Sequence, residues 1–308
     1  MNIEYRLATL DDVPGISSAF VEAFDDLYRK RGFFQAATPS VPPNPVFAYQ
    51  IKMTPQAFWV AQEDGNIIGF SDSFVRGSLW YFSWLFISPS YQGRDVGRTL
   101  LEKTLDSWSG VKITNRATIT FAFNPSSQFL YMKYGMYPRE PAYYVETSSK
   151  RILENPVQSD QNEDLDFEQM NLKESSTSVR QLDESVLGFS MEWNHHFCFE
   201  TKNKCYIFKR KKNDDRTPVG YVYVSPSGKV GPLAVSSSDL VKPILGKALR
   251  LSAEQKDVEK VRYYFPGSNV GAVELALKYN MRFEPYVFMS TKPFAKWENY
   301  VFHSAALM

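Results

Sequence analysis

The chain has 308 residues, 44% of them hydrophobic and 15% aromatic, which is too apolar for an intrinsically disordered protein. Its 35 basic and 34 acidic residues give a net charge of +1, so no general electrostatic attraction to nucleic acid or to an anionic membrane is expected. The chain has only two cysteines and no apolar leader, which argues against a disulfide-framed secreted protein. It also has no run of about 18 apolar residues, which argues against a membrane span. We therefore expect a cytoplasmic protein, and the length suggests two domains.

The N-terminal half alternates strand and helix patterns. Strands are predicted over 3–8, 57–62, 67–76, 79–87, 117–123 and 137–146. Helices are predicted from Val13-Pro14 onward, over 47–53, over 96–108 and from Asn124-Pro125 to about residue 134. Asp64-Gly65 indicates a tight hairpin between the second and third strands. The proline-rich stretch from about 31 to 54 is typical of a long binding loop, with prolines at Pro39, Pro42, Pro43 and Pro45.

An internal repeat links the two halves. Leu130–Met136 (LYMKYGM) is similar to Leu275–Met281 (LALKYNM), and an asparagine stands seven residues before the second position of each segment, at Asn124 and Asn269. Each segment continues into a Glu-Pro step and an aromatic strand. The second half should therefore repeat the first, with helices over 174–187, 240–252 and 272–279 and strands over 205–211, 219–224, 230–235 and 261–265. The polar, acidic residues between the halves predict a linker.

One segment indicates an anion site. Residues 85–101 read LFISPSYQGRDVGRTLL, a buried strand followed by a tight turn and a helix. Backbone N–H groups at a helix start attract phosphate, and glycine lets the backbone approach closely. Gly93 and Gly97 bracket the turn, while Arg94 and Arg98 can add charge-assisted hydrogen bonds to phosphate oxygens.

This segment resembles the acyl-CoA-binding motif of the GNAT superfamily of N-acetyltransferases, Gln/Arg-x-x-Gly-x-Gly/Ala after the fourth strand. Gln92–Gly97 (QGRDVG) matches the motif except that Asp95 replaces its first glycine, which adds a negative charge beside the expected pyrophosphate. Asn124, Tyr131 and Gly135 resemble the family's later motif, a short helix that carries a tyrosine near the coenzyme A thiol. The resemblance covers about residues 3–147.

The resemblance implies an α/β (α+β) fold of two tandem GNAT-like domains, each with a mixed, mostly antiparallel sheet flanked by helices. We expect a GNAT domain with an acetyl-CoA site over 1–149, a linker over 150–165 and a degenerate GNAT-like domain over 166–308. The expected cofactor-binding residues are Leu85, Phe86, Ile87, Gln92, Gly93, Arg94, Asp95, Val96, Gly97, Arg98, Thr99, Asn124 and Tyr131.

The implied reaction is direct acyl transfer from acetyl-CoA to a primary amine of a small molecule or peptide. Tyr131 is the candidate acid for the leaving thiolate, and fourth-strand N–H groups near Phe86 and Ile87 could polarise the thioester. The general base stays open, because the fourth strand begins Trp80-Tyr81-Phe82-Ser83-Trp84 without the glutamate that many family members carry. The acids expected nearby are Glu22, Asp25, Asp26 and Asp72, and a water relay or an already neutral amine is an equal alternative.

The second half lacks the cofactor turn, since Ser236–Pro243 (SSSDLVKP) follows its equivalent strand and Ala276 replaces Tyr131. We expect this half not to catalyse. His195, His196 and Cys198 lie close in sequence, but their spacing fits no standard zinc pattern, so no metal is expected. No nucleic-acid or membrane partner is expected, and the protein should be a monomer or homodimer.

Three alternatives to this function stay open. The first is a non-catalytic acyl-CoA-binding sensor or scaffold, which Asp95 and the missing strand glutamate favour. The second is an acetyltransferase resembling mycothiol synthase, which is also a tandem of similar size. The third is an antibiotic-modifying acetyltransferase, for which the first half offers no acidic cluster beyond Asp25-Asp26.

Overall fold

A computed structural model describes residues 2–31, 45–156, 164–170, 176–211 and 217–308. The predicted loop prolines Pro39, Pro42 and Pro43 lie outside these residues. The chain forms two compact units: unit 1 comprises residues 1–118 and 132–134, and unit 2 comprises residues 119–131 and 135–308. None of the described helices is long and apolar enough to span a membrane.

Unit 1 is built on the strands β1 (Glu4–Leu7), β2 (Trp59–Glu63), β3 (Asn66–Arg76), β4 (Leu79–Ile87) and the first part of β5 (Asn115–Phe121). They lie in sequence order; all neighbours are antiparallel except β4 and β5, which are parallel. The hairpin between β2 and β3 forms as predicted, because Asp64 and Gly65 both adopt the positive φ that such a turn requires.

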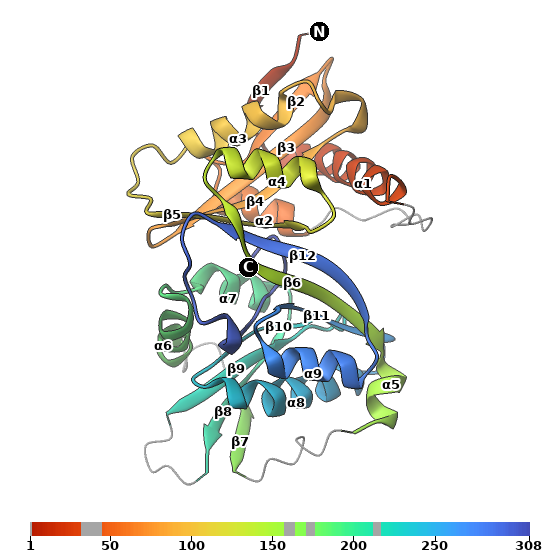
Figure 1. Ribbon diagram of the computed structural model, residues 1–308, viewed down its shortest axis with the longest axis vertical. Helices are drawn as coiled ribbons and strands as arrows, with labels where there is room; N and C mark the ends of the chain where they lie inside the picture. The colour runs from red at the N-terminus through yellow and green to blue at the C-terminus, as the bar shows by residue number, and fades with distance from the viewer. Residues whose placement is uncertain (1, 32–44, 157–163, 171–175, 212–216) are drawn as a thin grey trace. The chain divides into compact units, whose positions relative to one another are not determined.

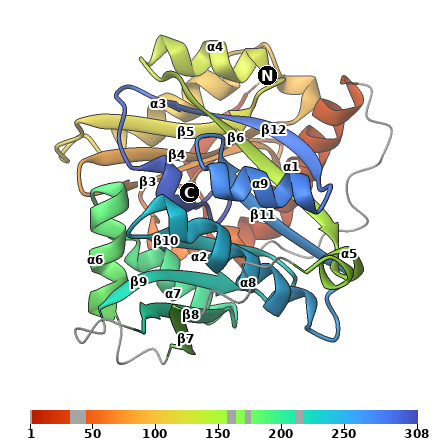
Figure 2. The same ribbon diagram turned by 60° about the horizontal axis from the view of Figure 1, so that its bottom comes forward.

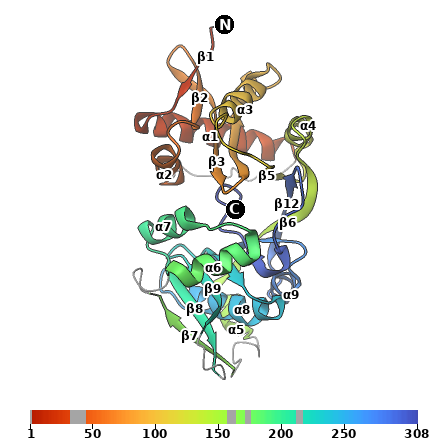
Figure 3. The ribbon, with the colours of Figure 1, turned by 90° about the vertical axis from the view of Figure 1, so that its left-hand side faces the viewer.

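Helices cover both faces of this sheet (Figure 3). The helices α1 (Val13–Arg29) and α2 (Pro45–Met53) pack on one face, where Ile16, Phe47 and Phe70 form an aromatic-rich core. On the other face α3 (Val96–Asp106) buries Val96 and Leu100 against Ala61 and Ile68. All three helices follow the predicted ranges within a few residues, since their apolar spacing already specified the buried face.

Unit 2 contains two groups of paired strands. One has the order β13-β10-β9-β8-β7 and the other the order β12-β6-β11. The first group consists of β7 (Leu165–Gln169), β8 (Lys204–Arg210), β9 (Pro218–Val224), β10 (Val230–Val235) and β13 (Tyr300–Val301). The second consists of β6 (Tyr137–Ser148), β11 (Lys260–Pro266) and β12 (Arg282–Ser290).

The helices of unit 2 are α4 (Pro125–Lys133, in part), α5 (Ser149–Glu154), α6 (Ser176–Leu187), α7 (Glu192–Glu200), α8 (Val241–Ala253) and α9 (Val270–Lys278). The helix α8 packs on β9 and β10, with α9 beside it (Figure 2). A single apolar core joins α8 and α9 to these strands, and Ile244, Leu245 and Leu275 are completely buried in it.

The internal repeat appears as matching backbone geometry. Gly135 and Asn280 follow α4 and α9 with φ values of 79° and 46°. In both segments the backbone N–H of the next residue donates to a carbonyl of the preceding helix. Met136 N–H donates to the Tyr131 carbonyl (3.1 Å), and Met281 N–H donates to the Ala276 carbonyl (2.9 Å). Ala276 therefore occupies in the second repeat the place that Tyr131 occupies in the first.

The last strands of the two repeats pair with each other. The strand β6 lies between β12 and β11, antiparallel to both, and Figure 1 shows β6 and β12 side by side. After β5, Ala122 N–H donates to the Pro285 carbonyl of β12 (3.1 Å). The strand that closes each sequence repeat therefore pairs with strands of the other repeat, and the compact units do not coincide with the predicted segments 1–149 and 166–308.

Besides the two-residue strand β13, three elements were not predicted from the sequence. The predicted linker begins with α5, a short charged helix whose Ile152 is buried in the core of unit 2, and β7 begins at Leu165, the last residue of the predicted linker. Residues 157–163 of the linker lie outside the described residues. The third element is α7, whose polar run Trp193-Asn194-His195-His196 hides a buried face formed by Asn194, Phe197 and Cys198.

Candidate functional site

The segment after β4 forms the predicted strand–turn–helix. A single turn of 3₁₀ helix over Pro89–Tyr91 leads into the turn, where Gly93 has a φ of 74°. The helix α3 then begins at Val96. A backbone hydrogen bond from Thr99 N–H to the Asp95 carbonyl (2.9 Å) joins the turn to the helix. The amides of Val96, Gly97 and Arg98 are therefore the first N–H groups of the helix, which have no partner within it. We call residues 92–98 the cradle.

Asp95 adopts the left-handed conformation, with a φ of 62°, just before α3. Glycine reaches this region at no steric cost, whereas a non-glycine residue pays roughly 1 kcal/mol, which accounts for the glycine that the family motif carries here. The Asp95 carboxylate makes no hydrogen bond to the backbone of the helix start. It is 70% exposed and pairs with Arg98 at 3.1 Å, so it does not occupy the cradle amides.

Gly97 lies over the end of β4. A Cβ placed on it would lie 3.6 Å from Ile87 Cγ1 and 3.7 Å from Leu85 Cδ2, which are ordinary van der Waals distances. The protein itself would thus accept alanine at this position. A need for glycine at 97 would therefore come from a bound ligand and not from the packing of α3 on β4.

The strand β4 carries a bulge before the cradle. Asp72 of β3 pairs with Trp84 and Ser73 pairs with Phe82, so Ser83 is the extra residue. The pairing of β4 with β5 ends at Phe82 and Thr118, although β4 continues to Ile87. Leu85, Phe86 and Ile87 thus extend beyond the last β5 pair, and backbone polar groups on that edge of β4 are available to a ligand.

Other side chains hold the cradle in place. Gln92 donates from Nε2 to the Ile87 carbonyl (3.0 Å), and the Tyr91 hydroxyl donates to Glu63 Oε2 (2.6 Å). The Arg94 guanidinium lies 5.7 Å from the centre of the Tyr91 ring. The contact between Tyr91 and Glu63 could not be predicted from the sequence, because an aromatic residue and an acid 28 positions apart give no local pattern.

The predicted acid Tyr131 and its helix cap belong to unit 2, whereas the cradle belongs to unit 1. Tyr131 is buried, and burial raises the pKa of its hydroxyl, which is therefore protonated at neutral pH. Asn124 caps α4 as predicted: its Oδ1 accepts from Ser127 N–H (3.3 Å), and its Nδ2 donates to Ser127 Oγ (2.8 Å).

The four candidate bases differ in their surroundings. Asp26 pairs with Lys30 at 2.6 Å, Glu22 is exposed, and Asp25 is half-buried on α1. Asp72 is completely buried; its Oδ1 accepts from Thr54 Oγ1 (3.0 Å), and its Oδ2 has no hydrogen-bond partner among the described residues. Burial raises the pKa of Asp72 well above its ordinary value.

The second repeat has no equivalent of the cradle. Its strand β10 is also irregular, around Gly231-Pro232, but α8 then follows a 3₁₀ turn over Ser238–Leu240 with no positive-φ residue. The start of α8 is covered by α9: a Cβ on Gly271 would lie 3.0 Å from Lys242 N, and Lys242 Nζ pairs with Glu274 at 2.6 Å. No group of His, Cys, Asp and Glu residues suited to a metal ion occurs in the part of the chain that the structure describes.

Residues 54–135 match the family model of the acetyltransferase (GNAT) domain. The chain carries a GNAT domain. This match spans the bulged strand β4, the cradle, α3 and α4, and it supports acyl transfer from coenzyme A in general. No curated protein matches the sequence significantly.

Solved structures share the fold of this chain over nearly its whole length. A putative acetyltransferase from Pyrococcus horikoshii has a TM-score of 0.75 at 18% identity, covering 99% of this chain and 95% of its own. A GCN5-related N-acetyltransferase from Sphaerobacter thermophilus has a TM-score of 0.66 at 12% identity, covering 96% and 98%. A tandem GNAT protein from the clavulanic acid biosynthesis pathway has a TM-score of 0.61 at 14% identity, covering 95% and 99%. The predicted fold and tandem arrangement are thus confirmed.

Proposed function

We propose that this chain transfers an acetyl group from acetyl-CoA to the primary amine of a small molecule or peptide. The observation that carries the proposal is the cradle after a bulged β4, where the Asp95 carboxylate pairs with Arg98 instead of closing on the helix-start amides. Such amides, with the positive end of the helix dipole, suit a pyrophosphate. A monomer or homodimer in the cytoplasm remains our expectation.

The residues of the chain have separate roles in this proposal. The amides of residues 93–98 bind the pyrophosphate, and Arg94 adds a charge beside it. The edge of β4 at Leu85, Phe86 and Ile87 orients the thioester arm, and acetyl-CoA supplies the activated acyl group. Val96 fixes the start of α3 through its buried side chain, and Thr99 closes the first helical turn with Oγ1 donating to the Asp95 carbonyl (3.1 Å).

Tyr131 is the proposed proton donor to the departing thiolate. Its raised pKa keeps the hydroxyl protonated across the physiological pH range, as a donor requires. Asn124 supports it by capping the helix on which it lies. Deprotonation of the amine is assigned to water or to an acceptor that arrives neutral, since Asp72, the candidate base whose pKa is raised by burial, is completely buried.

The test measures thiol release from acetyl-CoA with a panel of primary amines, together with direct binding of coenzyme A. Gly97→Ala should weaken coenzyme A binding roughly tenfold while leaving the melting temperature unchanged, because the protein accommodates this Cβ. Tyr131→Phe should lower kcat roughly 10²-fold with little change in cofactor affinity. If Gly97→Ala leaves turnover unchanged, this result would contradict the proposal that the cradle binds the cofactor.

A non-catalytic acyl-CoA sensor is the second candidate, and it is favoured by Asp95 in the place of a glycine. It predicts tight cofactor binding that is lost in Gly97→Ala, with no thiol release on any amine and no effect of Tyr131→Phe. The same panel therefore separates the two functions.

A further inference from the structure

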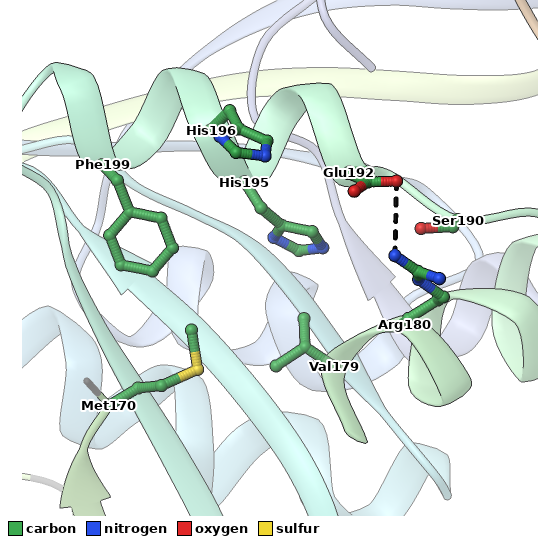
Figure 4. A pocket seen from close by; sticks show the side chains of 8 residues that line it. All are labelled: Met170, Val179, Arg180, Ser190, Glu192, His195, His196 and Phe199. Atoms are coloured by element: carbon green, nitrogen blue, oxygen red, sulfur yellow. Dashed lines mark ion pairs between the residues drawn. The ribbon is translucent and has the colours of Figure 1, made fainter. Parts of the chain in front are cut away.

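Unit 2 contains a pocket of about 250 Å³ (Figure 4). It is lined by side chains of α6, of α7, of Ser190 between these helices and of Met170, the residue that follows β7. A cavity of about 150 Å³ holds a benzene ring and drug-sized ligands need about 300 Å³ or more, so this pocket fits one ring or branched chain and a few further atoms.

The floor of the pocket is apolar. Met170, Val179 and Phe199 line it, and the ring of His195 lies among them (Figure 4). Val179 is 1% exposed and Met170 is 9% exposed, so their methyl groups are already desolvated by the fold. A ligand with an apolar side chain would complete this surface at little cost in ordering the protein.

His195 contributes the surface of its ring to the floor of the pocket and does not act there as an acid or a base. Its Nε2 bonds to Asp183 Oδ2 (2.8 Å), and its Nδ1 bonds to the Tyr223 hydroxyl (3.0 Å). Asp183 is completely buried and also accepts from the Tyr221 hydroxyl (2.5 Å) and from Met191 N–H (3.0 Å). With both nitrogens engaged, the imidazole is fixed in place and offers the pocket its carbon edge and its face. This excludes direct proton transfer to a ligand in the observed arrangement.

Opposite charges lie at one side of the pocket. Arg180 of α6 pairs with Glu192 of α7 at 3.3 Å, and their side chains are 46% and 57% exposed (Figure 4). An ion pair this exposed contributes little to stability, so a ligand that replaces it loses little. A ligand that carries a carboxylate and an ammonium group satisfies both residues at once and leaves neither charge uncompensated.

We propose that this pocket binds an α-amino acid with an apolar side chain. The ligand's carboxylate pairs with Arg180, its ammonium group pairs with Glu192, and its side chain lies on Met170, Val179, Phe199 and the His195 ring. None of these residues belongs to the proposed acetyl-CoA site, and occupation of the pocket requires neither acetyl-CoA nor turnover.

The test is calorimetric titration of the full chain, without acetyl-CoA, with four probes. L-Phenylalanine carries all three features; phenethylamine lacks the carboxylate, 3-phenylpropanoate lacks the ammonium group, and glycine lacks the side chain. Phenylalanine should bind at least tenfold more tightly than each of the others. No binding of phenylalanine at about 10 mM, where a site with a Kd of 1 mM is well occupied, would overturn the proposal. Equal binding of phenylalanine and either singly charged probe would do the same.

Two charge variants assign the contacts. Arg180→Gln should weaken phenylalanine about tenfold and leave phenethylamine unchanged, whereas Glu192→Gln should weaken phenylalanine and leave 3-phenylpropanoate unchanged. The matched control is Arg250→Gln with Glu254→Gln, an ion pair of similar exposure on α8 (2.9 Å), which should change nothing. Ser190→Phe should fill the pocket and abolish binding, while Thr177→Phe on the exposed side of α6 should not. Charge variants that alter all four probes alike would overturn the assignment.

Discussion

At the scale of single residues, the departures from the family motif have physical consequences that can be separated. Asp95 combines an unfavourable backbone conformation with an added negative charge, yet its carboxylate is directed to Arg98. Asp72 is a buried acid, and one of its oxygens has no hydrogen-bond partner among the residues that the structure describes. Neither consequence follows from residue type alone, because both depend on the direction of the side chain.

Asp95→Asn should raise the affinity for coenzyme A. Asparagine tolerates the left-handed conformation, and the substitution removes a negative charge near the pyrophosphate and releases Arg98. Charges a few ångströms apart in water interact by roughly 0.5–1 kcal/mol, so Kd should fall about two- to fivefold at low salt and less at high salt. Asp106→Asn, at the exposed far end of α3, is the matched control. Unchanged affinity would place the pyrophosphate away from residue 95.

Asp72→Asn should flatten the dependence of stability on pH. The pKa of Asp72 is raised in the folded protein above its ordinary value of 3.8, so the folded state binds the proton more tightly than the unfolded state. The contribution of this group is therefore fully present below about pH 4 and is lost as the pH rises through the folded pKa. Thermal unfolding from pH 4 upward should show the wild type losing stability relative to the variant. Parallel curves for the two proteins would contradict this assignment.

At the scale of elements, an asparagine caps the corresponding helix in both repeats, but the two asparagines differ in burial and in their hydrogen bonds. Asn124 caps α4 while half-buried, whereas Asn269 is completely buried and caps α9. Asn269 Oδ1 accepts from Ala272 N–H (3.0 Å), and its Nδ2 donates to the Tyr300 carbonyl of β13 (2.8 Å). The second asparagine therefore joins two elements as well as capping one.

Asn269→Ala should destabilise the chain more than Asn124→Ala. Loss of a cap alone costs about 1 kcal/mol, and the buried Tyr300 carbonyl left without its donor adds about 1–3 kcal/mol. Urea unfolding followed by circular dichroism measures both changes. Asn269→Asp, which keeps the cap acceptor and removes the donor, should fall between them. Equal losses for the two alanine variants would show that the bond to Tyr300 contributes nothing.

At the scale of the whole molecule, the two repeats depend on each other because the last strand of each repeat pairs with strands of the other repeat. The strand β6 comes from the first repeat in sequence, but it pairs along its length with β11 and β12 of the second. Separating the halves at residue 149 would therefore remove from the second repeat the strand that joins β11 to β12. Unit 2, which contains all three of these strands, should therefore unfold as a unit.

Residues 119–308, which retain β6, should form a more stable protein than residues 150–308, which lack it. Without β6, the strands β11 and β12 expose unpaired edges that favour aggregation. Size-exclusion chromatography and thermal unfolding of the two fragments measure the difference. A monomeric fragment 150–308 that unfolds as cooperatively as the longer one would contradict the role given to β6.

The sequence by itself determined the elements and the repeat. Local spacing of apolar residues, caps and turn residues specified β4, α3, α4 and the Asp64-Gly65 hairpin, because these depend on near neighbours in the chain. The motif of residues 92–98 was likewise readable, since a helix-start anion site is built from consecutive residues.

Only the tertiary structure decided which strands pair and which side chains meet. The exchange of β6, the direction of the Asp95 carboxylate and the Asp183–His195 pair beside a pocket all depend on contacts between distant positions. The polar run that contains His195 shows no sequence pattern of a site, because the hydrogen-bond partners of His195 lie on β9 and α6. Pairing between strands is set by long-range packing, which local sequence signals do not encode.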